Sequence, residues 1–177
     1  MSGLSKGIAR VEVALRWDPS PLGTAAHDLD LIAGTFTADD PYGDPAYLVH
    51  FDSRSPDGTI ALDRDSTDGR GLGDDEVMTL ELDRLAPRYV RVVVGVMIQQ
   101  SAGRLTFGEV AGTGVRVREG YAQLASDDLS AVAGATAAVV AEFARDAAGN
   151  WVFRPGVRGF DADPATFARI LGTRPGQ

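Results

Sequence analysis

The 177-residue sequence contains no cysteine, which excludes disulfides, thiolate metal sites and a thiol nucleophile. It also lacks any apolar run that approaches the ~18 residues of a membrane-spanning helix. Its first residues carry only the charge of Lys6 and have no apolar segment behind it, which is unlike a secretory signal. We therefore expect a cytoplasmic protein that is not inserted into a membrane.

Basic residues are fewer than acidic ones, and the deficit lies mainly in one segment of the chain. The formal net charge is −8, and the segment from Asp28 to Asp83 holds 15 acidic residues against three basic ones. Proteins that bind nucleic acids neutralise phosphates with clustered Lys and Arg. The charge pattern therefore argues against a nucleic-acid partner and directs attention to the acidic segment.

Alternation of apolar and polar residues predicts a series of β-strands. Val11, Val13 and Leu15 would face one side of a strand that begins near Ala9, and the proline at position 19 would end it. Similar patterns predict strands at Leu29–Phe36, Ala46–Phe51, Val77–Leu82, Tyr89–Ile98, Gly114–Arg118 and Trp151–Arg154. Short strands with Gly, Pro and Asp turns between them favour an all-β fold, a two-sheet antiparallel β-sandwich with short helical segments.

Several segments carry more specific expectations. Tyr89–Ile98 is almost entirely apolar and is expected to be a central strand, whereas Ser55-Pro56-Asp57-Gly58 is expected to join two antiparallel strands. Ser130–Arg145 is alanine-rich and ambiguous between helix and strand; we expect its second half to be a strand that pairs with Trp151–Arg154. Asp163 and Pro164 predict the start of a short C-terminal helix. No linker or repeat interrupts residues 1–177, which predicts one domain.

Aspartates gather in two places that could bind a metal ion. Asp28 and Asp30 open a predicted strand, and a glycine-punctuated loop from Asp63 to Glu76 leads into another. Calcium takes oxygen ligands from carboxylates and backbone carbonyls, and a loop that alternates Asp with Gly offers both. Asp and Gly are equally the common residues of turns, so composition alone leaves metal binding and plain turn chemistry both open.

The sequence offers little for catalysis. His27 and His50 are the two histidines, and neither stands in a triad-like context with a nucleophile. The glycines at 69, 71 and 73 lie among acidic residues with no helix after them, which is unlike a phosphate-binding loop. We therefore expect a protein that is not an enzyme.

Motifs along nearly the whole chain resemble the tellurite-resistance TerD family in order and spacing. The most specific are the Gly71-x-Gly73-Asp74-Asp75-Glu76 loop and the late Trp151-x-Phe153-Arg154. The others are Leu4-Ser5-Lys6-Gly7, Trp17-Asp18, Asp28-x-Asp30-Leu31, Ser55-Pro56-Asp57-Gly58, Phe107-Gly108-x-Val110, Asp128-Leu129-Ser130 and Gly159-Phe160.

The resemblance implies a β-sandwich with one or two calcium ions at one end, and a non-catalytic role in resistance to tellurite and other stress. It also implies scaffolding with other proteins, among them related stress-resistance proteins. Carried over by position, the metal ligands would be Asp28, Asp30, Asp65, Asp74, Asp75 and Glu76, with carbonyls of Gly69 and Gly71.

Three departures from the family pattern weaken the expected metal set. Ile32 stands where the family has a third aspartate, Phe51-Asp52 replaces an Asn pair, and Ile98-Gln99 replaces a His-Asp pair. Because calcium affinity follows the charge of the ligands, we expect fewer or weaker sites than in a typical member. The alternative is a TerD-like protein-interaction domain that has lost part or all of its metal binding.

Overall fold

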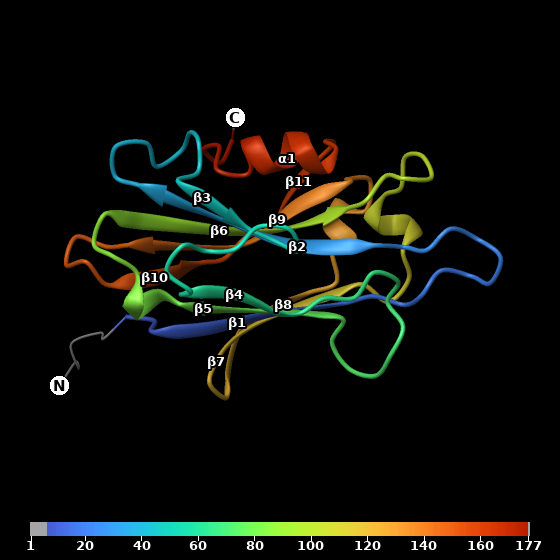
Figure 1. Ribbon diagram of the computed structural model, residues 1–177, viewed down its shortest axis with the longest axis horizontal. Helices are drawn as coiled ribbons and strands as arrows, with labels where there is room; N and C mark the ends of the chain where they lie inside the picture. Colours follow the sequence, from blue (N-terminus) through green and yellow to red (C-terminus); the bar gives the residue numbers. More distant parts are fainter. Residues whose placement is uncertain (1–6, 177) are drawn as a thin grey trace.

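Two antiparallel β-sheets face each other and enclose the main core in the computed structural model, which describes residues 7–176 (Figure 1). One sheet has the order β4-β5-β1-β7-β8, and the other has the order β10-β9-β6-β2-β3 with β11 paired to β9. The strands of the first sheet are β1 (Arg10–Arg16), β4 (Ile60–Arg64), β5 (Glu76–Glu81), β7 (Gly114–Glu119) and β8 (Ala122–Asp127). Those of the second are β2 (Leu29–Thr37), β3 (Tyr47–Val49), β6 (Tyr89–Ile98), β9 (Ala137–Arg145), β10 (Trp151–Arg154) and β11 (Arg158–Phe160).

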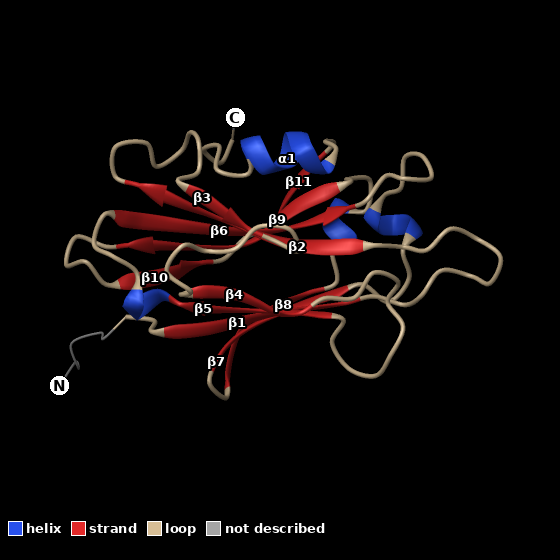
Figure 2. Ribbon diagram, viewed as in Figure 1, coloured by secondary structure: helices blue, strands red, loops and turns tan. Residues whose placement is uncertain are grey.

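Helices are short and lie outside the sandwich (Figure 2). The α-helix α1 (Pro164–Ile170) covers the outer face of the six-stranded sheet, and three 3-10 helices occupy connections: η1 (Leu82–Arg84), η2 (Phe107–Glu109) and η3 (Ser130–Val132). As expected, Asp163 caps α1, because its side chain accepts a hydrogen bond from the Thr166 amide at 2.7 Å and Pro164 follows. The predicted sandwich is confirmed. No helix within residues 7–176 is long and apolar enough to cross a membrane.

The main core forms because alternate residues of both sheets point inward. Val11, Val13 and Leu15 of β1 are at most 1% exposed, as their period of two predicts. The strand β6 lies between β9 and β2 and is buried along almost its whole length, which confirms it as a central strand.

A second, smaller core lies between the six-stranded sheet and α1. Phe167 and Leu171 pack there against Ile32, Phe36 and Val93, and all five are fully buried. Gly95 of β6 allows this approach, because a Cβ at that position would lie 2.6 Å from the Phe167 Cζ atom. Ile32, which replaces an acidic residue of the family pattern, is therefore used for packing.

The ambiguous segment divides as expected. Ser130–Val132 forms η3, and Ala137–Arg145 forms β9, which pairs with β10 on one side and β6 on the other. All but the last residue of β9 are buried. Its small side chains suit a strand that is covered on both faces, so tertiary packing overrides the helix propensity of alanine.

One turn prediction is wrong. The Ser55–Gly58 turn forms, with the Asp57 carboxylate accepting a hydrogen bond from the Thr59 amide at 3.1 Å, but it does not join paired strands. It leads from β3 to β4, which are edge strands of different sheets. Turn chemistry is local, whereas the choice of partner strand depends on the whole fold. The Leu4-Ser5-Lys6 part of the first motif lies outside the described residues.

Phe167→Ala should test how much the small core contributes. Loss of a fully buried phenylalanine leaves a cavity between α1 and the sheet, so the free energy of unfolding should fall by about 3–5 kcal/mol. Tyr121→Ala is the matched control, since Tyr121 is completely exposed and its loss should change stability by less than ~0.5 kcal/mol. Urea unfolding would measure both, and equal effects would contradict the packing described here.

Candidate metal centre

Acidic side chains converge at the end of the sandwich where β2 and β5 begin. The connections β1–β2 and β4–β5 both reach this end, as does the one that follows β6 (Figure 1). One group of three carboxylates within residues 7–176 brings its candidate ligand oxygens within 4.8 Å of one another: Asp30 of β2, Asp65 after β4, and Glu76 of β5. Residues from three separate parts of the chain therefore meet at one place.

Glu76 is the most deeply buried member of the group. It stands opposite Leu15 in the β1–β5 pairing, and it is 0% exposed. Its Oε1 atom accepts a hydrogen bond from the Leu31 amide at 3.2 Å, whereas its Oε2 atom is buried and has no hydrogen-bond partner among residues 7–176. Burial, followed by the charge of Asp30, raises the pKa of Glu76 to about 10. A carboxylate here needs a positive neighbour to stay ionised.

Asp30 and Asp28 extend the negative region along the start of β2. Burial raises the pKa of Asp30 to about 6, against the effect of the Gln99 side-chain amide, which donates to Oδ2 at 2.6 Å. Burial and then the neighbouring Asp30 raise the pKa of Asp28 to about 7. The Asp28 Oδ1 atom is also buried, and it finds no hydrogen-bond partner in the described part of the chain. Ionisation of the two aspartates is therefore unfavourable in the folded protein, as it is for Glu76.

These donors fit a hard divalent cation. Oxygens on opposite sides of a Ca²⁺ ion lie about 4.8 Å apart, since each is ~2.4 Å from the ion. The oxygens of Asp30, Asp65 and Glu76 satisfy this limit, and the unpartnered Glu76 Oε2 atom is free to ligate. A cation between them would also offset the burial and the mutual repulsion that raise the pKa values of Asp28, Asp30 and Glu76. The acidic group could therefore hold a metal ion.

The other predicted ligands are engaged elsewhere. Asp74 forms a two-pronged ion pair with Arg116, at 2.8 Å for each carboxylate oxygen. Asp75 accepts a hydrogen bond from the Trp17 amide at 2.8 Å, and burial raises its pKa. Adjacent strand-entry residues point to opposite faces, so 74, 75 and 76 cannot all reach one ion.

The two predicted carbonyl donors, Gly69 and Gly71, lie in the loop beside other groups. A Cβ at Gly69 would lie 2.5 Å from the Trp17 indole nitrogen, and its φ of +76° also favours glycine. A Cβ at Gly71 would lie 3.3 Å from Arg64 Nη2. The Trp17 indole donates to the His27 carbonyl at 2.7 Å, so Trp17 ties the residues before Asp28 to the glycine loop.

Gln99 is the contributor that sequence reasoning undervalued. As a replacement for an acidic residue, Gln99 was expected only to weaken the metal site. Its side chain nevertheless reaches Asp30, and its backbone amide donates to the Asp28 carbonyl at 2.9 Å. The available signal was its position directly after the central strand β6, which is paired with β2 up to Leu29 and Ile98.

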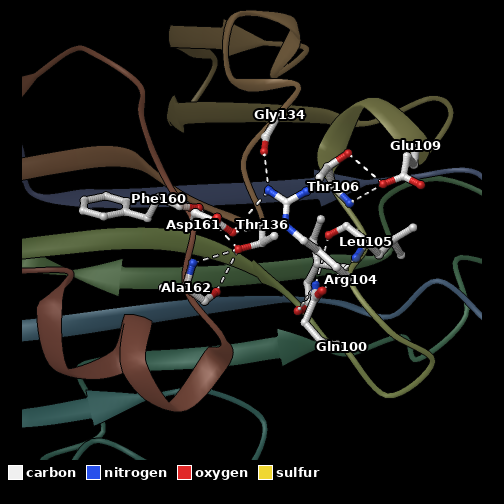
Figure 3. A network of polar contacts seen from close by, with 11 residues as sticks. Gln100, Arg104, Leu105, Thr106, Glu109, Gly134, Thr136, Phe160, Asp161 and Ala162 are labelled. Atoms are coloured by element: carbon white, nitrogen blue, oxygen red, sulfur yellow. Dashed lines mark hydrogen bonds and ion pairs between the residues drawn. The ribbon is translucent and has the colours of Figure 1, made fainter.

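A polar network holds the connection behind Gln99 in place (Figure 3). Gln100 closes a small loop, because its amide nitrogen donates to the Leu105 carbonyl at 3.0 Å and its oxygen accepts from the Leu105 amide at 2.7 Å. Arg104 reaches the Gly134 carbonyl at 3.1 Å and Asp161 at 3.2 Å. The chain that carries Gln99 is thus fixed to η3 and to the segment before α1.

The raised pKa values predict how stability depends on pH without metal. A carboxyl group with a raised pKa binds more protons in the folded state, so the folded state loses stability as pH rises above the unfolded value near 4 towards the folded value. Between pH 6.5 and 8.5, Asp28 and Glu76 should therefore lower the melting temperature of chelator-treated protein. His50, whose pKa is lowered by burial, acts oppositely but mainly below pH 6.5.

Thermal melts in chelator across this range would test the prediction. The melting temperature should fall with pH, and Glu76→Gln should flatten the fall because it removes the group with the most raised pKa. A melting temperature that rises with pH, or an unchanged slope in the variant, would contradict the arrangement.

Comparison with known proteins agrees with this fold. The chain is 29% identical over 179 residues to a tellurium resistance protein TerD of Serratia marcescens, covering 97% of this chain and 92% of that protein. It is also 29% identical to one from Alcaligenes sp, over 87% and 82% of the two chains. The uncharacterized protein YceE of Bacillus subtilis (strain 168) is 28% identical, over 94% and 89%.

Two solved structures share the architecture closely. A homologue of telluride resistance protein TerD from Streptomyces coelicolor A3(2) is 56% identical with a TM-score of 0.94, over 96% of this chain and 100% of that chain. A protein of unknown function is 63% identical with a TM-score of 0.94, over 96% and 99%. The TerD domain matches residues 1–169. The chain therefore belongs to the TerD domain family.

Proposed function

We propose that this protein is a calcium-binding, non-catalytic module whose acidic end becomes ordered around the ion. The observation that carries the proposal is the convergence of Asp30, Asp65 and Glu76, with ligand oxygens within 4.8 Å and one oxygen of Glu76 buried and unpartnered. Asp28 stands beside this group as a further source of carboxylate oxygens, and the Gln99 side chain donates a hydrogen bond to Asp30. A single ion suits this set better than two.

The donor chemistry favours calcium over other common metals. The three converging groups are carboxylates, whereas zinc prefers nitrogen and sulfur ligands in a tetrahedral set. Magnesium demands octahedral geometry and usually keeps several waters, so it is seldom held by a cage of protein ligands. Carboxylates from the starts of two strands and from one loop can together supply the hard oxygen ligands that calcium prefers.

The broader role is proposed from the relatives. Two of them are named tellurium resistance proteins, which supports a part for this chain in resistance to tellurite and other chemical stress. We place that role in the cytoplasm. Within this proposal the protein is a non-catalytic scaffold that contacts other proteins, among them related stress-resistance proteins. His50 uses Nδ1 to accept a hydrogen bond from the Asp52 backbone amide at 3.1 Å.

A protein-interaction domain with little metal binding is the second candidate. Two observations favour it. Asp74 is paired with Arg116 and Ile32 packs in the small core, so neither position supplies a ligand to a metal ion. In that case the acidic end would contact proteins directly.

Calorimetric titration of chelator-stripped protein with calcium tests the proposal. Wild type should release or absorb heat with saturation at one ion per chain, and Glu76→Gln should weaken binding by about tenfold or more, because a charged ligand is lost. Asp74→Asn is the matched control: it alters an acidic residue two positions away that pairs with Arg116, and it should leave calcium affinity unchanged. No heat at millimolar calcium would remove the metal claim.

The melting temperature separates the two candidate functions. A ligand that binds only the folded state must raise stability, by about 2.7 kcal/mol at a hundredfold excess over its dissociation constant. Calcium should therefore raise the melting temperature of wild type. For a tenfold loss of affinity, the stabilisation of Glu76→Gln at the same calcium concentration should fall to about half. Equal melting temperatures with calcium and with chelator would favour the interaction domain.

A further inference from the structure

The outer face of the six-stranded sheet carries three arginines around one glutamate. Arg154 of β10 stands directly opposite Glu142 of β9, so the two side chains share a face. Arg91 of β6 lies on the same face and pairs with Glu142 at 2.8 Å, and Arg158 of β11 approaches from the far side at 3.8 Å. Positive charge exceeds negative charge by two in this cluster.

Arg91 is the nearest ion-pair partner of Glu142. Its side chain is 3% exposed, and it also donates to the Pro41 carbonyl at 2.8 Å and the Gly172 carbonyl at 2.6 Å. Glu142 is nearly buried beside it. A buried pair of this geometry is largely self-contained, so Glu142 has little charge left to neutralise its other neighbours.

Arg158 and Arg154 are left short of acceptors. Arg158 donates to the Thr173 carbonyl at 3.2 Å, but its Nη2 atom is buried and finds no hydrogen-bond acceptor within residues 7–176. The Arg154 side chain is exposed and makes no hydrogen bond or ion pair to the part of the chain that the structure describes. Both line a pocket of about 320 Å³ whose other walls include Pro155, Gly156 and Pro175.

We propose that this pocket binds a small, doubly charged oxyanion such as phosphate, held between Arg154 and Arg158. Glu142 neutralises only one of the three positive charges of this cluster. The buried Nη2 atom of Arg158 has no hydrogen-bond acceptor within residues 7–176, so an anion between Arg158 and the exposed Arg154 would satisfy both guanidinium groups. The planar N–H groups of arginine match the oxygens of such an anion and form charge-assisted hydrogen bonds with them. The site lies on a different face from the acidic group and does not depend on calcium.

Titration of the chelator-treated full chain with inorganic phosphate, at constant ionic strength, tests the proposal by calorimetry. Wild type should bind one phosphate, and Arg154→Ala should weaken binding by about tenfold or more, because one charge-assisted contact is lost. Arg154 is exposed, so this variant should remain folded. Arg10→Ala, at an exposed end of β1 in the other sheet, is the matched control and should bind like wild type.

A second variant tests the role of the glutamate. Glu142→Gln leaves Arg91 and Arg158 without their ion-pair partner, so the net positive charge beside the pocket increases and phosphate affinity should rise severalfold. Absence of saturable phosphate binding, equal loss in Arg154→Ala and Arg10→Ala, or equal binding of chloride would each overturn the proposal. Calcium titration of the same samples is read separately, so that failure of one site does not bear on the other.

Discussion

The burial of carboxylates close to one another is the constraint on which the acidic end of this protein depends. Glu76 is buried at the start of β5, its charge is opposed by Asp30, and its pKa is raised to about 10 as a result. A fold that places such groups together without a cation must either protonate them or lose stability. The same acidic group becomes a binding site once a divalent ion lies among its oxygens. Binding of the ion would therefore also increase the stability of the folded state.

The sandwich provides this convergence through strand pairing. β5 pairs with β1 in one sheet and β2 pairs with β6 in the other, and both β2 and β5 begin at the same end. Glu76 also bridges the two sheets, because it accepts a hydrogen bond from the Leu31 amide of β2. The acidic group is therefore part of the contact between the sheets, and ion binding there would act on the packing of the sandwich.

Much of the fold could be predicted from the sequence because alternation along a strand reports burial directly. Val11, Val13 and Leu15 revealed β1, and the valine-rich β6 was identifiable as central. Which strands pair is decided by contacts far apart in the chain, and this explains why the Ser55–Gly58 turn was assigned the wrong partners. Local turn residues could not indicate that the chain changes sheets there.

The candidate site was predictable as a region and less so residue by residue. Spacing could show that Asp30 and Glu76 lie at the starts of strands, but it could not show that Asp74 forms an ion pair with Arg116. The charge cluster around Glu142 could not be predicted from the sequence either, because its arginines come from different strands. Side-chain partners across a sheet depend on register, which the sequence of one strand does not contain.

A crystal structure from calcium-containing solution would test the central claim most directly. The account predicts one ion within ~2.3–2.6 Å of carboxylate oxygens from Asp30, Asp65 and Glu76, with Asp74 still paired to Arg116. At millimolar calcium, an ion held by Asp74 and the glycine loop instead, or three carboxylates that remain together with no ion between them, would contradict it.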